Sequence, residues 1–189
     1  YGAHPDLHSF PTRRSSDLLS EFFSAGNMEG AKTYLKHYDN SIVESSMCRY
    51  CKNHTANAVL QVFKHRAEDN SISFCVQADI PEFLPILAPE LGVVLSNILE
   101  NACEACEKVN KCERIINFTT ETDEACLRIE VRNSVAITIK FEEGLPVTTK
   151  KDGGTGTKSV ARIVEKNGGM FRFKQENNIF VTQLILPLQ

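Results

Sequence analysis

Two short polar stretches carry residues whose types and spacing could bind a charged ligand. The first is LSNILENACEAC, Leu95 to Cys106, in a segment with helical periodicity. At about 100° per residue its polar members fall on one stripe beside the apolar face: Asn97, Asn101, Glu104 and Lys108. Asparagine is unfavourable in mid-helix, whereas its amide oxygen can ligate a hard cation such as Mg²⁺, which usually also holds phosphates. Hydrogen bonds from both amides to neighbouring loops are the alternative explanation.

The second stretch is GGTGTKSV, Gly153 to Val160, with glycines at 153, 154 and 156 before a short helical pattern. Glycine lets a ligand approach the backbone closely, and a helix N-terminus presents free N–H groups to an anion. Further donors come from Thr155, Thr157 and Lys158. A flexible hinge is the alternative, because a glycine-rich turn alone is weak evidence. The spacing does not fit a Walker-type loop, and no strand directly precedes it as a dinucleotide-binding turn requires.

The elements that position these stretches are predicted from periodicity and turn residues. Helices are expected over 53–68, 90–110 and 157–167, and strands over 71–78, 114–122, 125–133, 170–175 and 179–186. The last four strands form two hairpins. Residues 134–153 show no clear element and are expected to be a long functional loop. This order favours an α+β fold, a two-layer sandwich in which helices cover one face of a mixed sheet.

The apolar stripe of helix 90–110 is the clearest sign of a core. Its members are Leu91, Leu95, Ile98, Ala102 and Ala105. The chain is 42% hydrophobic and 24% charged, and its formal net charge of −3 gives no basic field for nucleic acid. It has no run of 18 apolar residues that could cross a membrane. Seven cysteines without a recognisable signal peptide indicate reduced thiols in the cytoplasm.

The first 18 residues differ in character from the rest. DLHSFPTRRSSDL, Asp6 to Leu18, resembles the in-frame translation of a common sequencing adapter oligonucleotide. We therefore treat residues 1–18 as a disordered artefact that carries no functional weight. Natural sequence upstream of Leu19 is expected to be missing. About 170 residues remain, enough for one domain with a helical extension.

Together and in this order, the two polar stretches resemble motifs of the GHKL ATPase superfamily, which includes gyrase, a heat-shock chaperone, histidine kinases and mismatch-repair ATPases. The asparagine helix resembles its N box, and Gly154-Thr-Gly-Thr-Lys resembles its last glycine box. The closest resemblance is to sensor histidine kinases similar to peptide quorum-sensing receptors of Gram-positive bacteria. In that branch a Tyr-Cys-x-Asn segment and an Ala-x-Leu segment precede the ATP-binding domain. The matching residues here are Tyr50-Cys51-Lys52-Asn53 and Ala58-Val59-Leu60. The resemblance covers about residues 28–187.

The resemblance implies an ATP-binding fold of the Bergerat type and roles for the matching residues. Asn101 corresponds to the asparagine that ligates the Mg²⁺ bridging the ATP phosphates. Asn97 corresponds to an asparagine near the phosphates. Gly154 and Gly156 correspond to the glycines at the base of the ATP lid, and their polar neighbours Thr155, Thr157 and Lys158 are expected to bind ATP with them.

Two departures from the family pattern affect individual sites. Asn133 stands where an aspartate usually binds the adenine amino group, because VRNSV replaces the usual Asp-x-Gly-x-Gly box. An asparagine carbonyl can still accept a hydrogen bond from that amine. Thr157 replaces the usual leucine of the last box. The implied ligands are therefore ATP and Mg²⁺, with Asn133 at the base.

The resemblance also implies the catalytic domain of a two-component sensor histidine kinase, which transfers the γ-phosphoryl group of ATP to a histidine on an upstream helix. Residues 51–189 would form the ATP-binding domain, and residues 19–50 a remnant of the helical dimerisation hairpin. His37, His54 and His65 stand in no H-box-like context, so the phosphoacceptor is expected to be missing and no catalytic residue is assigned. The implied partners are a second copy of the chain and a response regulator. The domain is expected in the cytoplasm without membrane contact, and a membrane anchor upstream stays open.

Three alternatives stay open to different degrees. A degenerate GHKL domain could dock a partner without useful ATP turnover. An ATP-hydrolysing relative is disfavoured, because Asn97 stands where that branch commonly has a glutamate base. Paired Cys48-x-x-Cys51 and Cys103-x-x-Cys106 suggest zinc, but the second pair lies within a helix, whereas structural zinc pairs usually occupy tight turns.

Overall fold

The computed structural model describes residues 49–147 and 155–189. The predicted artefact at 1–18, almost all of the predicted hairpin remnant at 19–50, and Gly154 lie outside the described residues. The helices are α3 (His54–Asp69), α4 (Ala88–Glu107), α5 (Thr155–Lys166) and a 3₁₀ turn (Lys111–Glu113). The strands are β1 (Ser73–Gln77), β2 (Ile115–Thr122), β3 (Cys126–Ser134), β4 (Phe141–Glu142), β5 (Leu145–Pro146), β6 (Met170–Glu176) and β7 (Ile179–Pro187).

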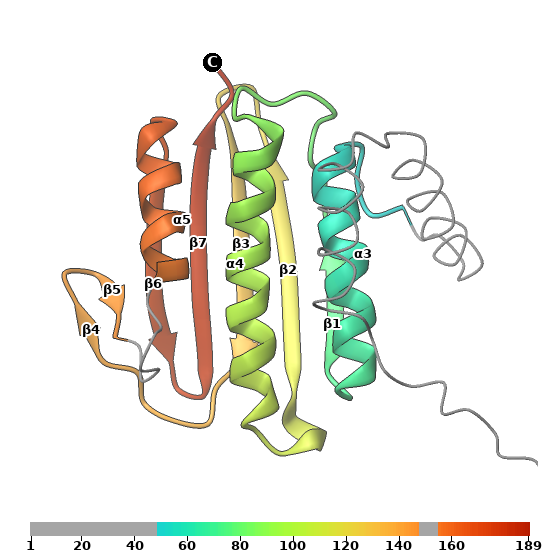
Figure 1. Ribbon diagram of the computed structural model, residues 1–189, viewed down its shortest axis with the longest axis vertical. Coiled ribbons are helices and arrows are strands. Elements are labelled where there is room, and N and C mark those ends of the chain that lie inside the picture. The colour runs from blue at the N-terminus through green and yellow to red at the C-terminus, as the bar shows by residue number, and fades with distance from the viewer. Residues whose placement is uncertain (1–48, 148–154) are drawn as a thin grey trace, which may run out of the picture. The chain divides into compact units, whose positions relative to one another are not determined.

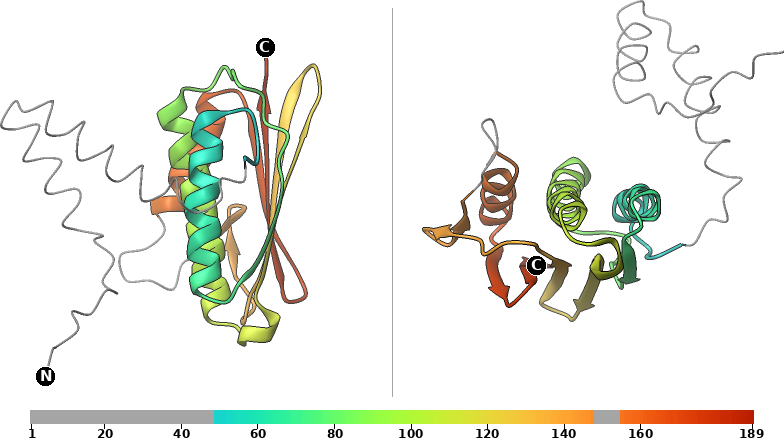
Figure 2. Two further views of the ribbon diagram at one scale, coloured as in Figure 1. Left: turned by 90° about the vertical axis from the view of Figure 1, so that its right-hand side faces the viewer. Right: turned by 90° about the horizontal axis from the view of Figure 1, so that it is seen from below.

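A five-stranded sheet in the order β1-β2-β3-β7-β6 forms one layer (Figure 1). β1 pairs with β2 in parallel, and the other neighbours are antiparallel. Helices α3, α4 and α5 lie side by side on one face of this sheet (Figure 2). The predicted α+β sandwich with a mixed sheet is therefore confirmed. Among the described residues, no helix is both long and apolar enough to span a membrane.

Helix α4 lies at the centre of the helical layer and supplies much of the core. Pro89 occupies its first turn, where the missing proline N–H costs nothing. Four members of the predicted stripe are buried, and Ala105 is half-buried. Cys103 and Cys106, which the predicted stripe omitted, are fully buried as well. Buried thiols of this kind pack as small hydrophobic groups.

Asn53 joins the start of the domain to the loop after β1. Its side-chain Oδ1 caps α3 by accepting a hydrogen bond from the Ala56 N–H at 3.0 Å. Its Nδ2 donates to the Glu82 carbonyl at 3.1 Å. The side chain is 8% exposed, so both bonds are shielded from water. The asparagine of the Tyr-Cys-x-Asn segment thus has a structural role as a helix cap.

The structure corrects several predicted boundaries. Residues 134–153 were expected to contain no element, but β4 and β5 form a short hairpin there, with Glu143 and Gly144 at positive φ in its turn. Helix α4 ends at Glu107 instead of residue 110. Helix α5 begins at Thr155, two residues earlier than predicted, and therefore includes Gly156 in its first turn. This shift brings the glycine-rich stretch into direct contact with α4.

The turn between α5 and β6 requires glycine at two positions. Gly168 has φ +69° and ends α5, as the sequence predicts. A Cβ on Gly169 would lie 2.4 Å from the Ile185 carbonyl oxygen and 2.9 Å from Val164 Cγ1. Ile185 belongs to β7, an internal strand whose backbone is held by hydrogen bonds on both sides and cannot shift without breaking them. We therefore expect Gly169→Ala to lower the free energy of unfolding by about 1–3 kcal/mol, measured by urea denaturation.

Gly92→Ala is the matched control for this prediction. Gly92 lies within α4, and a Cβ there would meet only Thr55 Cγ2 at 3.5 Å, an ordinary contact. Since alanine is preferred to glycine in a helix by about 0.8–1 kcal/mol, this variant should be at least as stable as the wild type. Equal stability of Gly169→Ala and wild type would contradict the expected clash.

Candidate functional site

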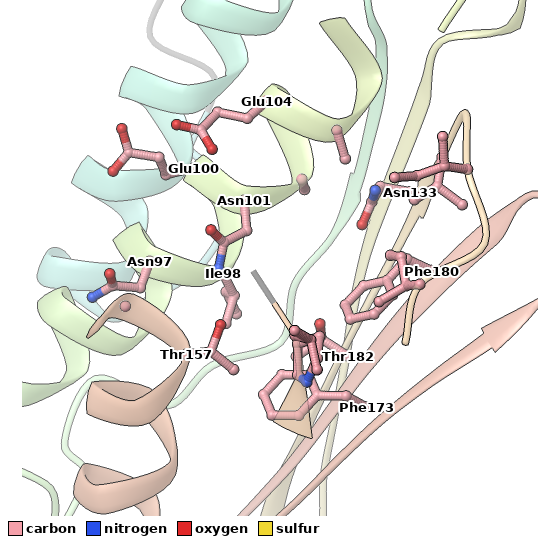
Figure 3. A pocket seen from close by; sticks show the side chains of 18 of the residues that line it. Asn97, Ile98, Glu100, Asn101, Glu104, Asn133, Thr157, Phe173, Phe180 and Thr182 are labelled. Atoms are coloured by element: carbon pink, nitrogen blue, oxygen red, sulfur yellow. The ribbon is translucent and has the colours of Figure 1, made fainter. Parts of the chain in front are cut away.

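A cavity of about 590 Å³ opens between α4, the first turn of α5 and the face of the sheet that the helices cover. The segment that leads from β3 to β5 closes one side of it, with Ile137, Ile139 and Pro146 among the lining residues. Figure 3 shows Asn97 and Asn101 on the α4 side and Asn133, Phe173 and Phe180 on the sheet side. The cavity therefore has a polar wall from helices and a more apolar wall from strands.

The α4 wall consists of the polar stripe predicted from helical spacing. Asn97, Asn101, Glu104 and Lys108 all line the cavity. Asn101 is exposed, and its amide forms no hydrogen bond with any part of the chain that the structure describes. An amide with both ends open to a cavity can offer its oxygen to a cation or its N–H groups to an anion.

Asn97, one turn earlier, has a different environment. Its Nδ2 donates to the Val93 carbonyl of its own helix at 2.7 Å. Its Oδ1 lies against the backbone of α5, since a Cβ on Gly156 would be only 2.5 Å from that oxygen. The two asparagines therefore differ: one amide is held between helices, and the other faces the cavity.

The first turn of α5 contributes Gly156 and Thr157 to the cavity lining. The first N–H groups of an α-helix have no partner within the helix and favour an anion. Lys158, which the sequence also suggested, is exposed and is not among the lining residues. The side chain of Thr155 lies outside the described part of the structure.

Asn133 lies at the far side of the cavity, at the end of β3, and is 2% exposed. Its Nδ2 donates to the Ser134 carbonyl at 3.0 Å, and no described group donates to its Oδ1. Asn133 lines the cavity, and in Figure 3 its side-chain oxygen points toward it. The sheet thus presents a hydrogen-bond acceptor to the cavity.

Aromatic rings lie beside this acceptor. Phe180 pairs with Asn133 across β3 and β7, and Phe173 pairs with Thr182 across β6 and β7. The Phe173 and Phe180 rings stack with centroids 6.2 Å apart, and Phe141 of β4 stacks on Phe180 at the same distance. Sequence analysis did not identify these residues as part of the site. Such a wall suits a planar heteroaromatic group.

The cysteine pair of α4 is buried and does not line the cavity. Burial raises the pKa of the Cys103 thiol to about 11 and also raises the pKa of Cys106. Because the thiolate is the form that ligates metals, this burial disfavours a metal site on the pair. Within residues 49–147 and 155–189, no three His, Cys, Asp or Glu side chains form a cluster that could hold a metal. Cys48 lies outside the described residues.

Ion pairs fix the helices that form the cavity. Glu90 near the start of α4 accepts hydrogen bonds from Lys166 and Asn167 at the end of α5. The Lys166 contact holds the pKa of the Glu90 carboxyl below its usual range. On the other side, Arg66 of α3 pairs with Glu100 and Glu107 of α4. These contacts link α4 to both neighbouring helices.

Comparisons with known proteins give a family and structures with the same fold. The model of a family described as a GHKL domain matches residues 88–187. The catalytic domain of the histidine kinase ThkA has a TM-score of 0.55 at 22% identity, over 71% of this chain and 91% of that chain. The histidine kinase domain of a blue-light-activated kinase from Erythrobacter litoralis has a TM-score of 0.51 at 14% identity, over 71% and 65% of the two chains. At these identities the solved structures show a common fold. The comparison with curated proteins gives no match.

Proposed function

The chain belongs to the GHKL domain family, and on that premise we propose that residues 51–189 bind Mg²⁺–ATP as the catalytic domain of a two-component sensor histidine kinase. The observation that carries the proposal is the cavity between α4, α5 and the sheet. Its helical end offers amides and helix N–H groups, and its sheet side offers an acceptor beside stacked aromatic rings. These features match the triphosphate and the base of a nucleotide.

At the phosphate end, we assign Mg²⁺ to Asn101. Its amide faces the cavity without a partner in the described structure, and amide oxygens are among the ligands that Mg²⁺ accepts. When bound, the ion neutralises charge on the phosphates. The backbone of 154–157, with the Thr155 and Thr157 hydroxyls, would hold the phosphate oxygens. Lys158 is left out of this set because its exposed side chain does not line the cavity.

At the base end, the Asn133 oxygen would accept a hydrogen bond from the adenine amino group. Phe173 and Phe180 would pack beside the ring, and Thr182 lies between them and α4 in the view of Figure 3. Burial of a planar base between apolar groups contributes binding energy without requiring a charge. The phosphates would then be held by α4 and α5, and the base by the sheet.

The proposed reaction is in-line transfer of the γ-phosphoryl group to a neutral imidazole nitrogen. The bond between the γ-phosphorus and the bridging oxygen breaks, ADP leaves, and a nitrogen–phosphorus bond forms. Positioning and electrostatics supply most of the catalysis in phosphoryl transfer. Asn97 in place of a glutamate base argues against hydrolysis. The imidazole would be that of a histidine on a helix upstream of the domain, and a response regulator would then accept the phosphoryl group in the cytoplasm.

The test is transfer in trans. The full chain is incubated with Mg²⁺, ATP labelled on its γ-phosphate, and a separate helical-hairpin polypeptide that contains an H box. We expect acid-labile, base-stable label on the hairpin, and none on a hairpin whose histidine is replaced by alanine. Nucleotide binding without transfer to any hairpin would refute the proposed histidine kinase activity. Absence of nucleotide binding by the folded chain would favour a docking module.

A further inference from the structure

We infer that Asn97 is a positioning residue, and not a ligand of the phosphates or the metal. Its amide sets the distance between α4 and the first turn of α5, and thereby the position of the α5 N–H groups relative to Asn101. The inference rests on the proposed nucleotide site. It changes the role of Asn97, which the family resemblance placed near the phosphates.

The contacts of Asn97 are the first reason. Its Nδ2 is used within α4, in a 2.7 Å hydrogen bond to the Val93 carbonyl. This bond turns the Oδ1 toward α5, where a Cβ on Gly156 would lie 2.5 Å from Oδ1 and 3.4 Å from Cγ. Figure 3 shows Asn97 beside the start of α5, while Asn101 points toward Thr157 and the cavity. The Asn97 amide therefore fills the space between two helix backbones.

The attachment of α5 at its other end is the second reason. Glu90 accepts hydrogen bonds from Lys166 and Asn167, and Val160 and Val164 are fully buried. These contacts anchor the middle and the C-terminal end of α5. The first turn has the Asn97–Gly156 contact instead. A methyl group on Gly156 must therefore either break the Asn97–Val93 hydrogen bond and turn the amide away, or displace the N-terminal end of α5; both change the contact that sets the position of the first turn.

This arrangement separates the two ends of the proposed nucleotide site. Asn133, Phe173 and Phe180 lie on the sheet and do not depend on the Asn97–Gly156 contact. Displacing the first turn of α5 should thus weaken binding of the phosphates and leave binding of the base unchanged. A general loss of folding would weaken both.

The distances also identify a variant that distinguishes positioning from ligation. The same Cβ on Gly156 would lie 3.8 Å from Asn97 Cβ, an ordinary van der Waals contact. Alanine at position 97 therefore makes room for alanine at position 156. If Asn97 only positions α5, the double variant Asn97→Ala/Gly156→Ala recovers the affinity for Mg²⁺–ATP that Gly156→Ala loses. If Asn97 is a ligand, the double variant is at least as impaired as Gly156→Ala.

The experiment compares the full chain with Gly156→Ala, Asn97→Ala and the double variant. Calorimetric titration gives the affinity for Mg²⁺–ATP, ligand-observed NMR gives the affinity for adenosine, and thermal unfolding checks the fold. Because small misplacements in such sites cost up to about a hundredfold, we expect Gly156→Ala to lower the ATP affinity by about tenfold or more, with adenosine unchanged. Asn97→Ala removes the amide between the helices and should lower the ATP affinity by about threefold to just under tenfold, less than Asn101→Ala, whereas the double variant should stay within about threefold of wild type.

Two outcomes would overturn the inference. One is a loss of ATP affinity in Asn97→Ala as large as that in Asn101→Ala, and this single variant decides the matter even if Gly156→Ala does not fold. The other is a folded double variant no better than Gly156→Ala. Failure of the wild type to bind Mg²⁺–ATP is a separate result, which refutes the proposed function together with the role assigned to Asn97.

Discussion

Replacement of Asn101 by alanine is expected to lower the affinity of the chain for Mg²⁺–ATP by about tenfold to a hundredfold, the range for groups that hold or orient a metal. The amide lines the cavity without a partner in the described structure, so its removal breaks no internal hydrogen bond. Because the lost contact is to the metal, residual binding should be the same with Mg²⁺ and with EDTA. Calorimetric titration under both conditions measures the effect.

Asn117→Ala provides the matched control for Asn101→Ala. Asn117 lies on β2 opposite Arg132 of β3 and Cys75 of β1, with its side chain on the sheet face away from the helices. The same change of side chain there should leave both ATP affinity and its dependence on Mg²⁺ unchanged. A folded Asn101→Ala variant that still binds ATP in a Mg²⁺-dependent way would refute the assignment of the metal to Asn101.

The second large effect concerns the base: ADP should bind at least about tenfold more tightly than GDP or IDP. The Asn133 oxygen faces the cavity as an acceptor, which suits the 6-amino group of adenine and opposes the 6-oxygen of guanine and hypoxanthine. Turning the amide over would give up the Nδ2 bond to the Ser134 carbonyl and set two oxygens against each other. A buried group without a partner costs about 1–3 kcal/mol.

Ser134 cannot move to accommodate a reversed amide. Its hydroxyl donates to the Glu113 carbonyl at 2.6 Å and accepts from the Ile115 N–H at 3.0 Å. Its carbonyl also accepts from the buried Cys106 thiol at 3.7 Å. These contacts tie the residue after Asn133 to α4 and to the start of β2. The orientation of the Asn133 amide is thereby fixed. An aspartate would need no such fixing, because both of its oxygens are acceptors.

Competition titrations with ADP, GDP and IDP test this prediction. Asn133→Ala removes the acceptor, so the three affinities should converge at a lower value. Thr182→Val, on the neighbouring strand, keeps Asn133 and should preserve the preference for ADP. Equal affinities of the wild-type chain for ADP and GDP would show that the amide turns freely.

The layout of the fold could be predicted from the sequence because its signals are local. Alternation and the Asn177-Asn178 turn, with Asn177 at φ 53°, define the last hairpin, and the apolar stripe defines α4. The β4–β5 hairpin was missed because strands of two residues show no alternation. Boundaries near glycines were also misplaced, since the contact of Gly156 with Asn97 is tertiary.

The candidate site was predictable in its residue types and less so in its geometry. The 100° spacing places Asn97 and Asn101 on one stripe, but the different neighbours of the two amides depend on how α5 packs. Thr157 and Lys158 are adjacent in sequence, yet one lines the cavity and the other is exposed, because the start of α5 sets which side faces α4. The sequence pattern gives Phe173 and Phe180 no feature that distinguishes them from core residues. Only the strand pairing places them beside Asn133 and Thr182.

The topology of the sheet also has a consequence for folding kinetics. β2–β3 and β6–β7 join segments close in sequence, whereas β1 pairs in parallel with β2 only after the chain has passed through α4. Closing that longer loop costs conformational entropy before the pairing returns any free energy. The α3–β1 edge is therefore expected to join the domain after the two hairpins have formed.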